Sequence, residues 1–125
     1  MDQDLKKQLA QDNDGLLTYE YIANNIGQCD DIMPELVDNM LVADSTGQFV
    51  ASAARYLHAI DPEKYAASIA RLVAGAIDRD RERRYLPDLI ESLYGTDYEQ
   101  HADELSAADD NFRRLYKRVK VAEGI

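Results

Sequence analysis

Hydrophobic residues recur every three or four positions along most of the chain, which is the spacing of one face of an α-helix. The pattern predicts helices over residues 2–11, 19–25, 31–41, 49–60, 62–77, 86–93 and 97–121. A short β-hairpin near Val42 to Val50 is the alternative reading of that one stretch. We therefore expect an all-α fold, a compact orthogonal bundle of about six or seven helices.

Residues with capping preferences indicate where several of these helices begin and end. Asp61 is a candidate N-cap, and Pro62 follows it in the first turn, where a missing N–H group costs nothing. Thr18 is the candidate N-cap of the second helix. Gly27 and Gly95 are typical C-terminal stops, because glycine adopts a positive φ without strain. No regular repeat of about 20–50 residues is evident in the sequence.

Near the C-terminus, hydrophobic residues recur every seven positions, at Tyr98, Leu105, Phe112 and Val119. Thr96 and Glu99 fit a capping box at the start of this segment. The stripe predicts one long helix over residues 97–121, with a split at Ser106 or Asp109 as the alternative. Such a stripe packs within its own domain or pairs with a second copy, so a homodimer through this helix is one expectation.

The chain of 125 residues, 46% of them hydrophobic, has the size and composition of a single domain, expected to span residues 1–125. Its apolar runs are interrupted by charges, so no membrane-spanning segment is expected. The first residues lack the basic start and apolar stretch of a secretory signal. These features favour a cytoplasmic protein.

Charge is unevenly distributed along the chain. There are 24 acidic and 14 basic residues, a net charge of −10, and residues 8–54 contain no lysine or arginine. Basic residues cluster instead at Arg79–Arg84 and Arg113–Lys120. The net charge disfavours nucleic-acid binding by bulk electrostatics, whereas an acidic surface attracts a basic partner protein or simply keeps the chain soluble.

Residues with catalytic or metal-binding potential are few. Cys29 is the only cysteine, so neither an internal disulfide nor a thiolate metal cluster can form. Neither His58 nor His101 has the glutamate three positions earlier that a di-iron bundle requires. Glycine-rich phosphate loops, dinucleotide fingerprints and zinc spacings are also absent from the sequence. We expect no enzymatic activity, no catalytic or metal-binding residue, and no cofactor.

Two turns, Asp12–Leu17 and Asp44–Phe49, resemble the middle of an EF-hand calcium loop. In both, oxygen-bearing side chains precede a glycine, and a hydrophobic residue follows two positions later. The positions that would supply the first acidic ligand and the final bidentate glutamate hold apolar or aromatic residues instead. A degenerate EF-hand-like protein is therefore a further alternative, together with an acidic mimic of DNA.

Residues Leu17–Gly27, followed by the predicted helix Asp31–Leu41, resemble a helix-turn-helix motif. In DNA-binding members the second helix enters the major groove, so the resemblance implies a regulatory protein linked to transcription. Here that helix carries only carboxylates, which repel phosphates, and no basic residue that could read a base. The motif is therefore expected to serve protein contacts.

These observations favour an adaptor domain that binds a basic protein surface through an acidic helical face. Tyrosine is abundant, with eight residues against two phenylalanines and no tryptophan, and its amphipathic ring suits wet interfaces. The predicted interaction residues are four acids and two flanking tyrosines: Asp30, Asp31, Glu35, Asp38, Tyr19 and Tyr21. The principal alternative is the transcription-linked protein, with the two basic clusters making any nucleic-acid contact.

Overall fold

The computed structural model describes residues 1–122, and within them every element is helical. The α-helices are α1 (Gln3–Leu9), α2 (Leu16–Asn24), α3 (Met33–Ala43), α4 (Gln48–Ile60), α5 (Ala66–Arg79), α6 (Leu86–Tyr94), α7 (Ala102–Ala108) and α8 (Asp110–Ala122). Two 3₁₀ turns, η1 (Asp30–Ile32) and η2 (Tyr98–His101), precede α3 and α7. The all-α prediction is confirmed, and the hairpin considered near residues 42–50 is a tight loop between two helices.

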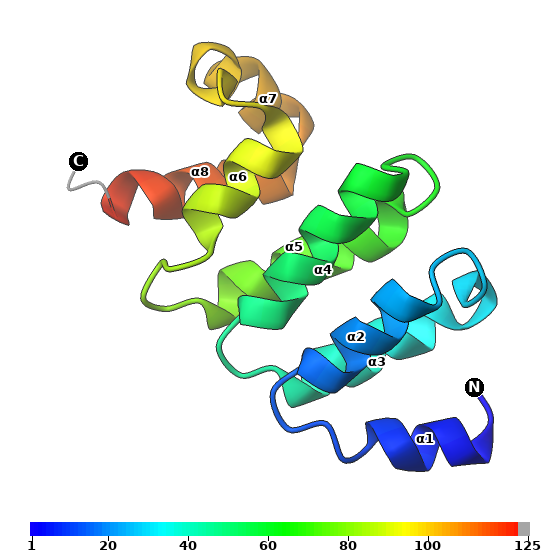
Figure 1. Cartoon of the computed structure of the whole chain (residues 1–125). Helices are drawn as coiled ribbons and strands as arrows, with labels where there is room; N and C mark the ends of the chain where they lie inside the picture. The colour runs from blue at the N-terminus through cyan, green and yellow to red at the C-terminus, as the bar shows by residue number, and fades with distance from the viewer. Residues whose placement is uncertain (123–125) are drawn as a thin grey trace.

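The helices pack in pairs that stack beside one another (Figure 1). α2 pairs with α3, α4 with α5, and α6 with α8. Helices α2, α4 and α6 are in contact in that order and form one layer, while α3, α5 and α8 form a second. One hydrophobic core runs between the layers, and its largest fully buried side chains include Leu36, Leu57, Leu72, Leu89 and Phe112.

Three junctions between successive helix pairs are built alike, each around one aspartate. Asp12, Asp44 and Asp80 precede α2, α4 and α6, and their carboxylates accept hydrogen bonds from backbone N–H groups that a helix start leaves unpaired. One carboxylate oxygen in each junction accepts the N–H six residues further on, at 2.9, 2.9 and 3.1 Å from Thr18, Val50 and Leu86. These bonds fix where each first-layer helix begins.

The residue three positions after each aspartate has a left-handed backbone. Gly15 and Gly47 occupy this position at the first two junctions, with φ of 102° and 92°. At the third junction the residue is Arg83, with φ of 57°, the only non-glycine residue with positive φ in the described part of the chain. Because this arginine replaces the expected glycine, the sequence does not reveal the repeated unit that the structure shows.

Each junction is also closed by a side chain from a second-layer helix. Arg79 on α5 donates to the carbonyl groups of Leu41 and Asp44, at 2.7 and 2.9 Å. Asn39 on α3 donates to the carbonyl of Leu9, the last residue of α1, at 3.0 Å. At the third junction, Arg118 on α8 donates to the carbonyl groups of Ile77 and Asp80. These donors satisfy carbonyls at helix ends, so part of the basic content is structural.

The structure corrects the predicted start of the second helix. α2 begins at Leu16, directly after Gly15, so Thr18 lies inside the helix and is not its N-cap. The buried hydroxyl of Thr18 instead donates to the Asp12 carboxylate at 2.6 Å. The predicted N-cap at Asp61 is also corrected, because α5 begins at Ala66 with Tyr65 at the N-cap position. The Asp61 carboxylate instead accepts the backbone N–H of Lys64 at 3.1 Å in the turn between α4 and α5.

The C-terminal segment is split where the alternative reading placed a break. α7 ends at Ala108, and the extended backbone of Asp109 separates it from α8. Phe112 and Val119 of the predicted stripe are buried in the core of this chain. The expected capping box is absent, because the helical turn begins at Tyr98 and has no side-chain cap.

Candidate functional site

Three of the predicted acidic site residues share one exposed stripe. Asp31 lies in η1, and Glu35 and Asp38 lie on α3, at spacings that place all three on one side of the helix. The stripe continues to Val42, whose side chain is 88% exposed. We call these four residues the acidic stripe. It combines negative charge with one exposed apolar side chain at its C-terminal end.

Two carboxylates of the acidic stripe have partners within the chain. Glu35 lies 2.8 Å from the amino group of Met1, and Asp38 forms an ion pair with Arg71 on α5. The side chain of Asp38 is nevertheless 64% exposed. Exposed ion pairs contribute only about 0–1 kcal/mol, so a basic partner can exchange with them. Asp31 is exposed and forms no ion pair or hydrogen bond with another residue of the described chain.

The fourth predicted acid, Asp30, is held away from the stripe by the start of α5. It lies 2.7 Å from the Lys64 ammonium group and accepts a 2.6 Å hydrogen bond from the Tyr65 hydroxyl. These hydrogen bonds lower the pKa of Asp30 and raise the pKa of both Lys64 and Tyr65. Asp30 therefore links η1 to the turn that precedes α5, and its carboxylate has a structural role.

Next to it, the thiol of Cys29 is buried, and burial together with the neighbouring carboxylates of Asp30 and Asp31 raises its pKa. A raised pKa keeps the thiol protonated at neutral pH, whereas the thiolate is the nucleophilic form. Cys29 thus has the environment of a packing residue.

The structure places the two predicted tyrosines on α2, the neighbouring helix. The ring of Tyr19 packs against Phe49 and Tyr56 on α4, with ring centroids 6.3 Å apart in both pairs. Tyr21 is half-buried and packs against the hydrophobic core. Within residues 1–122, no hydrogen bond or ring contact joins either tyrosine to the acidic stripe. The sequence-based grouping of six site residues is therefore divided between α2, which carries the tyrosines, and η1 with α3, which carry the acids.

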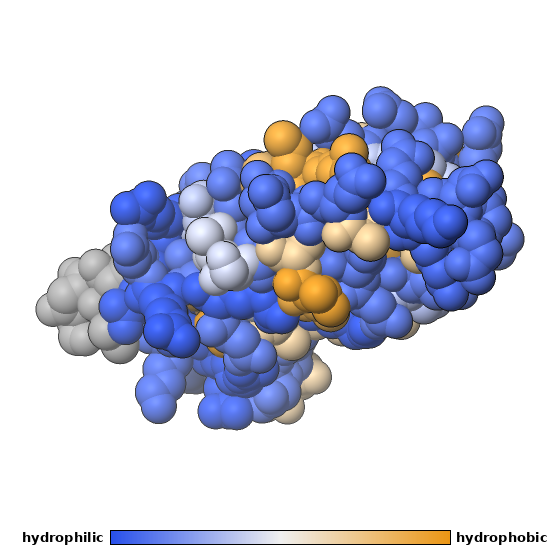
Figure 2. All heavy atoms as spheres, turned by 90° about the horizontal axis from the view of Figure 1, so that it is seen from below, coloured by the Kyte–Doolittle hydropathy of each residue, from blue (hydrophilic) through white to orange (hydrophobic). Residues whose placement is uncertain are grey.

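The exposed surface carries little hydrophobic area. Figure 2 shows a face that is mostly hydrophilic, with small, separated hydrophobic patches. The large hydrophobic side chains exposed on the described residues are Leu16, Leu17, Val42 and Ile60. Because scattered apolar residues are normal on a surface, this pattern does not indicate a broad apolar interface.

The two EF-hand-like turns use their carboxylates internally. Asp12 accepts hydrogen bonds from three backbone N–H groups and the Thr18 hydroxyl, and Asp44 accepts four backbone N–H groups and the Thr46 hydroxyl. Burial alone would raise the pKa of Asp12, but its hydrogen bonds outweigh burial and lower it. Among residues 1–122 there is no group of three or more histidine, cysteine, aspartate or glutamate side chains placed to hold a metal ion.

Comparisons with known proteins found no match to this chain. No family model matches the chain, and neither the curated proteins nor the solved structures contain a significant match to it. None of the helices in the described residues is long and apolar enough to cross a membrane.

Sequence reasoning missed two features of the surface. The sequence placed Val42 only in the alternative hairpin, although its spacing of four from Asp38 continues the acidic stripe. The second is spatial: Arg83 of the first basic cluster and four residues of the Arg113–Lys120 cluster are far apart in the sequence but line one groove between α5 and α8. Only the packing of α5 against α8 reveals that proximity.

Proposed function

We propose that this protein is a cytoplasmic interaction domain that binds a basic surface of a partner protein through the acidic stripe. The observation that carries the proposal is the alignment of Asp31, Glu35 and Asp38 with the exposed Val42 on one side of η1 and α3. The carboxylates would steer a basic partner and select against acidic ones. Val42 would supply the apolar anchor that exposed charges alone lack.

The stacked helix pairs suit this role because they hold the stripe on a packed support. α3 is anchored by four fully buried side chains, Met33, Leu36, Val37 and Met40. A rigid face loses little conformational entropy when a partner binds, so more of the contact energy appears as affinity. The protein acts as a preformed docking surface in this proposal and requires no folding step on binding.

The transcription-linked alternative is weaker for a physical reason. DNA binding would require α3, the second helix of the predicted motif, to approach phosphate groups. The exposed side of α3 carries Glu35 and Asp38, and no lysine or arginine lies between residues 8 and 54. Repulsion would oppose that approach at every orientation of the stripe.

A dimer through the C-terminal stripe is likewise disfavoured. Phe112 and Val119 are 0% and 1% exposed in the single chain. Pairing through them would require these side chains to leave the core, which forfeits about 1.5–3 kcal/mol for each large apolar side chain. We therefore propose that a single chain is the docking unit.

Site-specific cross-linking tests the proposal at the stripe itself. A photoreactive amino acid placed at Val42 is expected to cross-link a basic protein from a lysate, and the yield should fall as salt rises. The same group at the exposed position Asp103 on α7 is the control, because it lies on a different helix. Equal cross-linking of the same protein from both positions, or yields independent of salt, would refute docking at the stripe.

A further inference from the structure

Arg83 from the first basic cluster and four residues of the second line a single open groove of about 550 Å³ between α5, the turn after it and α8. Its lining residues are Ile77, Asp78, Arg83, Arg113, Arg114, Lys117 and Arg118. Five of these seven side chains are cationic, and one is acidic. Such a concentration of positive charge stands out in a chain whose net charge is −10.

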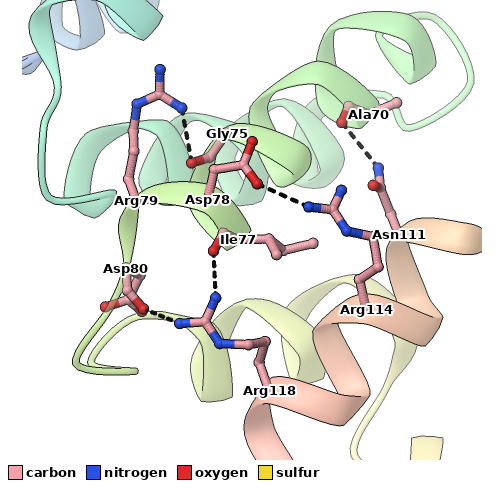
Figure 3. A network of polar contacts seen from close by, with 9 residues as sticks. All are labelled: Ala70, Gly75, Ile77, Asp78, Arg79, Asp80, Asn111, Arg114 and Arg118. Carbon is pink, nitrogen blue, oxygen red and sulfur yellow. Dashed lines mark hydrogen bonds and ion pairs between the residues drawn. The ribbon is translucent and has the colours of Figure 1, made fainter.

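Internal partners account for only part of this positive charge. Arg118 donates to the carbonyl groups of Ile77 and Asp80 at 2.6 and 2.7 Å, and Arg114 pairs with Asp78 at 2.9 Å (Figure 3). Arg113 pairs with Asp110 at 2.6 Å. The contacts of Arg114 and Arg118 point their guanidinium groups toward the end of α5 and hold the groove in shape, whereas the Arg113 pair lies within α8.

Arg83 and Lys117 are the two basic residues of the groove whose charges have no partner within the chain's described residues. Neither forms an ion pair with a carboxylate of the described residues 1–122. The Nε atom of Arg83 is buried and has no hydrogen-bond partner. A buried donor without a partner is unfavourable, so contacts within residues 1–122 leave the Arg83 guanidinium incompletely satisfied.

The backbone at Arg83 provides a second, independent observation. Its φ of 57° is a conformation that a residue with a side chain adopts at a cost in free energy, and the equivalent positions at the other two junctions hold Gly15 and Gly47. The fold itself therefore accepts glycine at this position. An arginine held there against its backbone preference, with its side chain in a basic groove, is typical of a binding site.

We infer that this groove binds a compact phosphate-type oxyanion, such as the diphosphate group of a small soluble molecule, with Arg83 and Lys117 as the principal ligands and Arg113 and Arg114 alongside. Guanidinium groups match the oxygen geometry of phosphate and donate paired hydrogen bonds to it. The bound anion would pair with the positive charge of Arg83, which has no carboxylate partner among residues 1–122.

The charge of the remaining molecule favours a compact anion over a long one. The groove is bordered by Asp78 and Asp110, and no basic residue lies between positions 8 and 54. A nucleic-acid strand that extended beyond the groove would meet acidic surface and be repelled. A diphosphate fits inside the groove and avoids that repulsion.

Calorimetric titration of the full chain with inorganic pyrophosphate tests the inference. The wild-type protein is expected to bind saturably, with one site per chain. Arg83→Gly should weaken the affinity at least about tenfold, and Lys117→Gln several-fold, because each removes a charge-assisted contact. Lys7→Gln on α1 removes one charge far along the chain and should leave the affinity unchanged.

Arg83→Gly also separates lost binding from lost folding. Glycine relieves the positive φ, so the melting temperature without ligand should stay the same or rise while the increase caused by pyrophosphate disappears. The inference is overturned if wild-type protein shows no saturable binding up to about 10 mM pyrophosphate, or if Arg83→Gly binds as tightly as wild type. A single-stranded oligonucleotide or a glutamate-rich peptide that bound more tightly than pyrophosphate, with the same dependence on Arg83, would overturn it in favour of that macromolecule.

Discussion

Single aspartates determine where three of the helices begin. The first N–H groups of a helix have no partner within the helix, and the carboxylates of Asp12, Asp44 and Asp80 accept several of them at once. Hydrogen bonds to a charged acceptor are stronger than neutral ones. These three aspartates therefore contribute more to the stability of the fold than the exposed acids of the stripe do, although both groups look alike in the sequence.

Asp44 should be the most sensitive of the three positions, because it is 1% exposed and accepts four backbone N–H groups. Asp44→Ala is expected to lower the free energy of unfolding by about 2–4 kcal/mol, since it leaves buried donors without a partner. Chemical denaturation measures the loss. Asp31→Ala, at an exposed acid of the stripe, is the control and should change stability by less than about 0.5 kcal/mol. Equal effects of the two substitutions would contradict the role of Asp44.

The lowered pKa of Asp12 predicts a pH-dependent contribution to stability. Its hydrogen bonds from Thr18, Gly15 and Asp14 favour the charged form in the folded state, so the folded pKa lies below the ordinary value of 3.8. The contribution is complete above that value and is lost as pH falls through the folded pKa.

Asp12→Asn tests this sign. At pH 7 the variant should be less stable than wild type by about 1–2 kcal/mol. The difference should shrink as the pH is lowered below 3.8 during acid denaturation followed by circular dichroism. A difference that stays constant or grows on acidification would show that the Asp12 carboxylate does not act through its charge.

At the scale of elements, the break between α7 and α8 shows how a local polar contact overrides a continuous hydrophobic pattern. The seven-residue stripe predicts one helix, but Asp109 accepts the Phe112 N–H at 3.2 Å and the Tyr94 hydroxyl at 2.7 Å. These two bonds cap α8 and join it to α6. The segment can then fold back, with α7 packed beside α8.

Tyr94→Phe tests this link between α6 and α8. Burial and the neighbouring Asp109 carboxylate raise the pKa of Tyr94, so its hydroxyl keeps its proton and donates throughout the physiological range. Its removal should lower the free energy of unfolding by about 1–2 kcal/mol in thermal or chemical denaturation. Tyr56→Phe is the matched control, because that hydroxyl makes only a 3.5 Å contact with the carbonyl of Ala23. Similar losses of stability in both variants would contradict a stabilising role for the hydrogen bond between Tyr94 and Asp109.

At the scale of the whole molecule, hydrophobic spacing predicted the helices but could not predict how they stack. The buried stripes of α3 and α5 follow directly from the sequence, because core-facing positions repeat with the helical period. The repeated junction escaped notice because Arg83 stands where Gly15 and Gly47 stand in the other two. The aspartates of those turns suggested metal ligands, whereas their partners are backbone N–H groups.

The candidate site was predictable only in part for a similar reason. Helical spacing alone places Asp31, Glu35 and Asp38 on one side of α3. The ion pairs of Asp30 with Lys64 and of Asp38 with Arg71 depend on the packing of α3 against α5, which no local pattern encodes. The basic groove was hidden for the same reason. Its residues come from two separate segments, 77–83 and 113–118, which only the packing of α5 against α8 brings together.

If the acidic stripe is a docking surface, partner binding depends on the positions of its carboxylates as well as on net charge, and charge-matched affinity capture separates the two. The stripe variant is Asp31→Asn, Glu35→Gln and Asp38→Asn, and the control variant is Asp88→Asn, Glu91→Gln and Asp103→Asn. Both lose three negative charges from exposed positions, so their net charges are equal.

Captures are compared between wild type and the two variants at low and moderate salt. We predict that wild type and the control variant retain the same basic protein, that moderate salt weakens its capture, and that the stripe variant loses it at both salt concentrations. Retention of that protein by the stripe variant, or its equal loss from both variants, would contradict a specific role for the stripe and reduce its carboxylates to general surface charge.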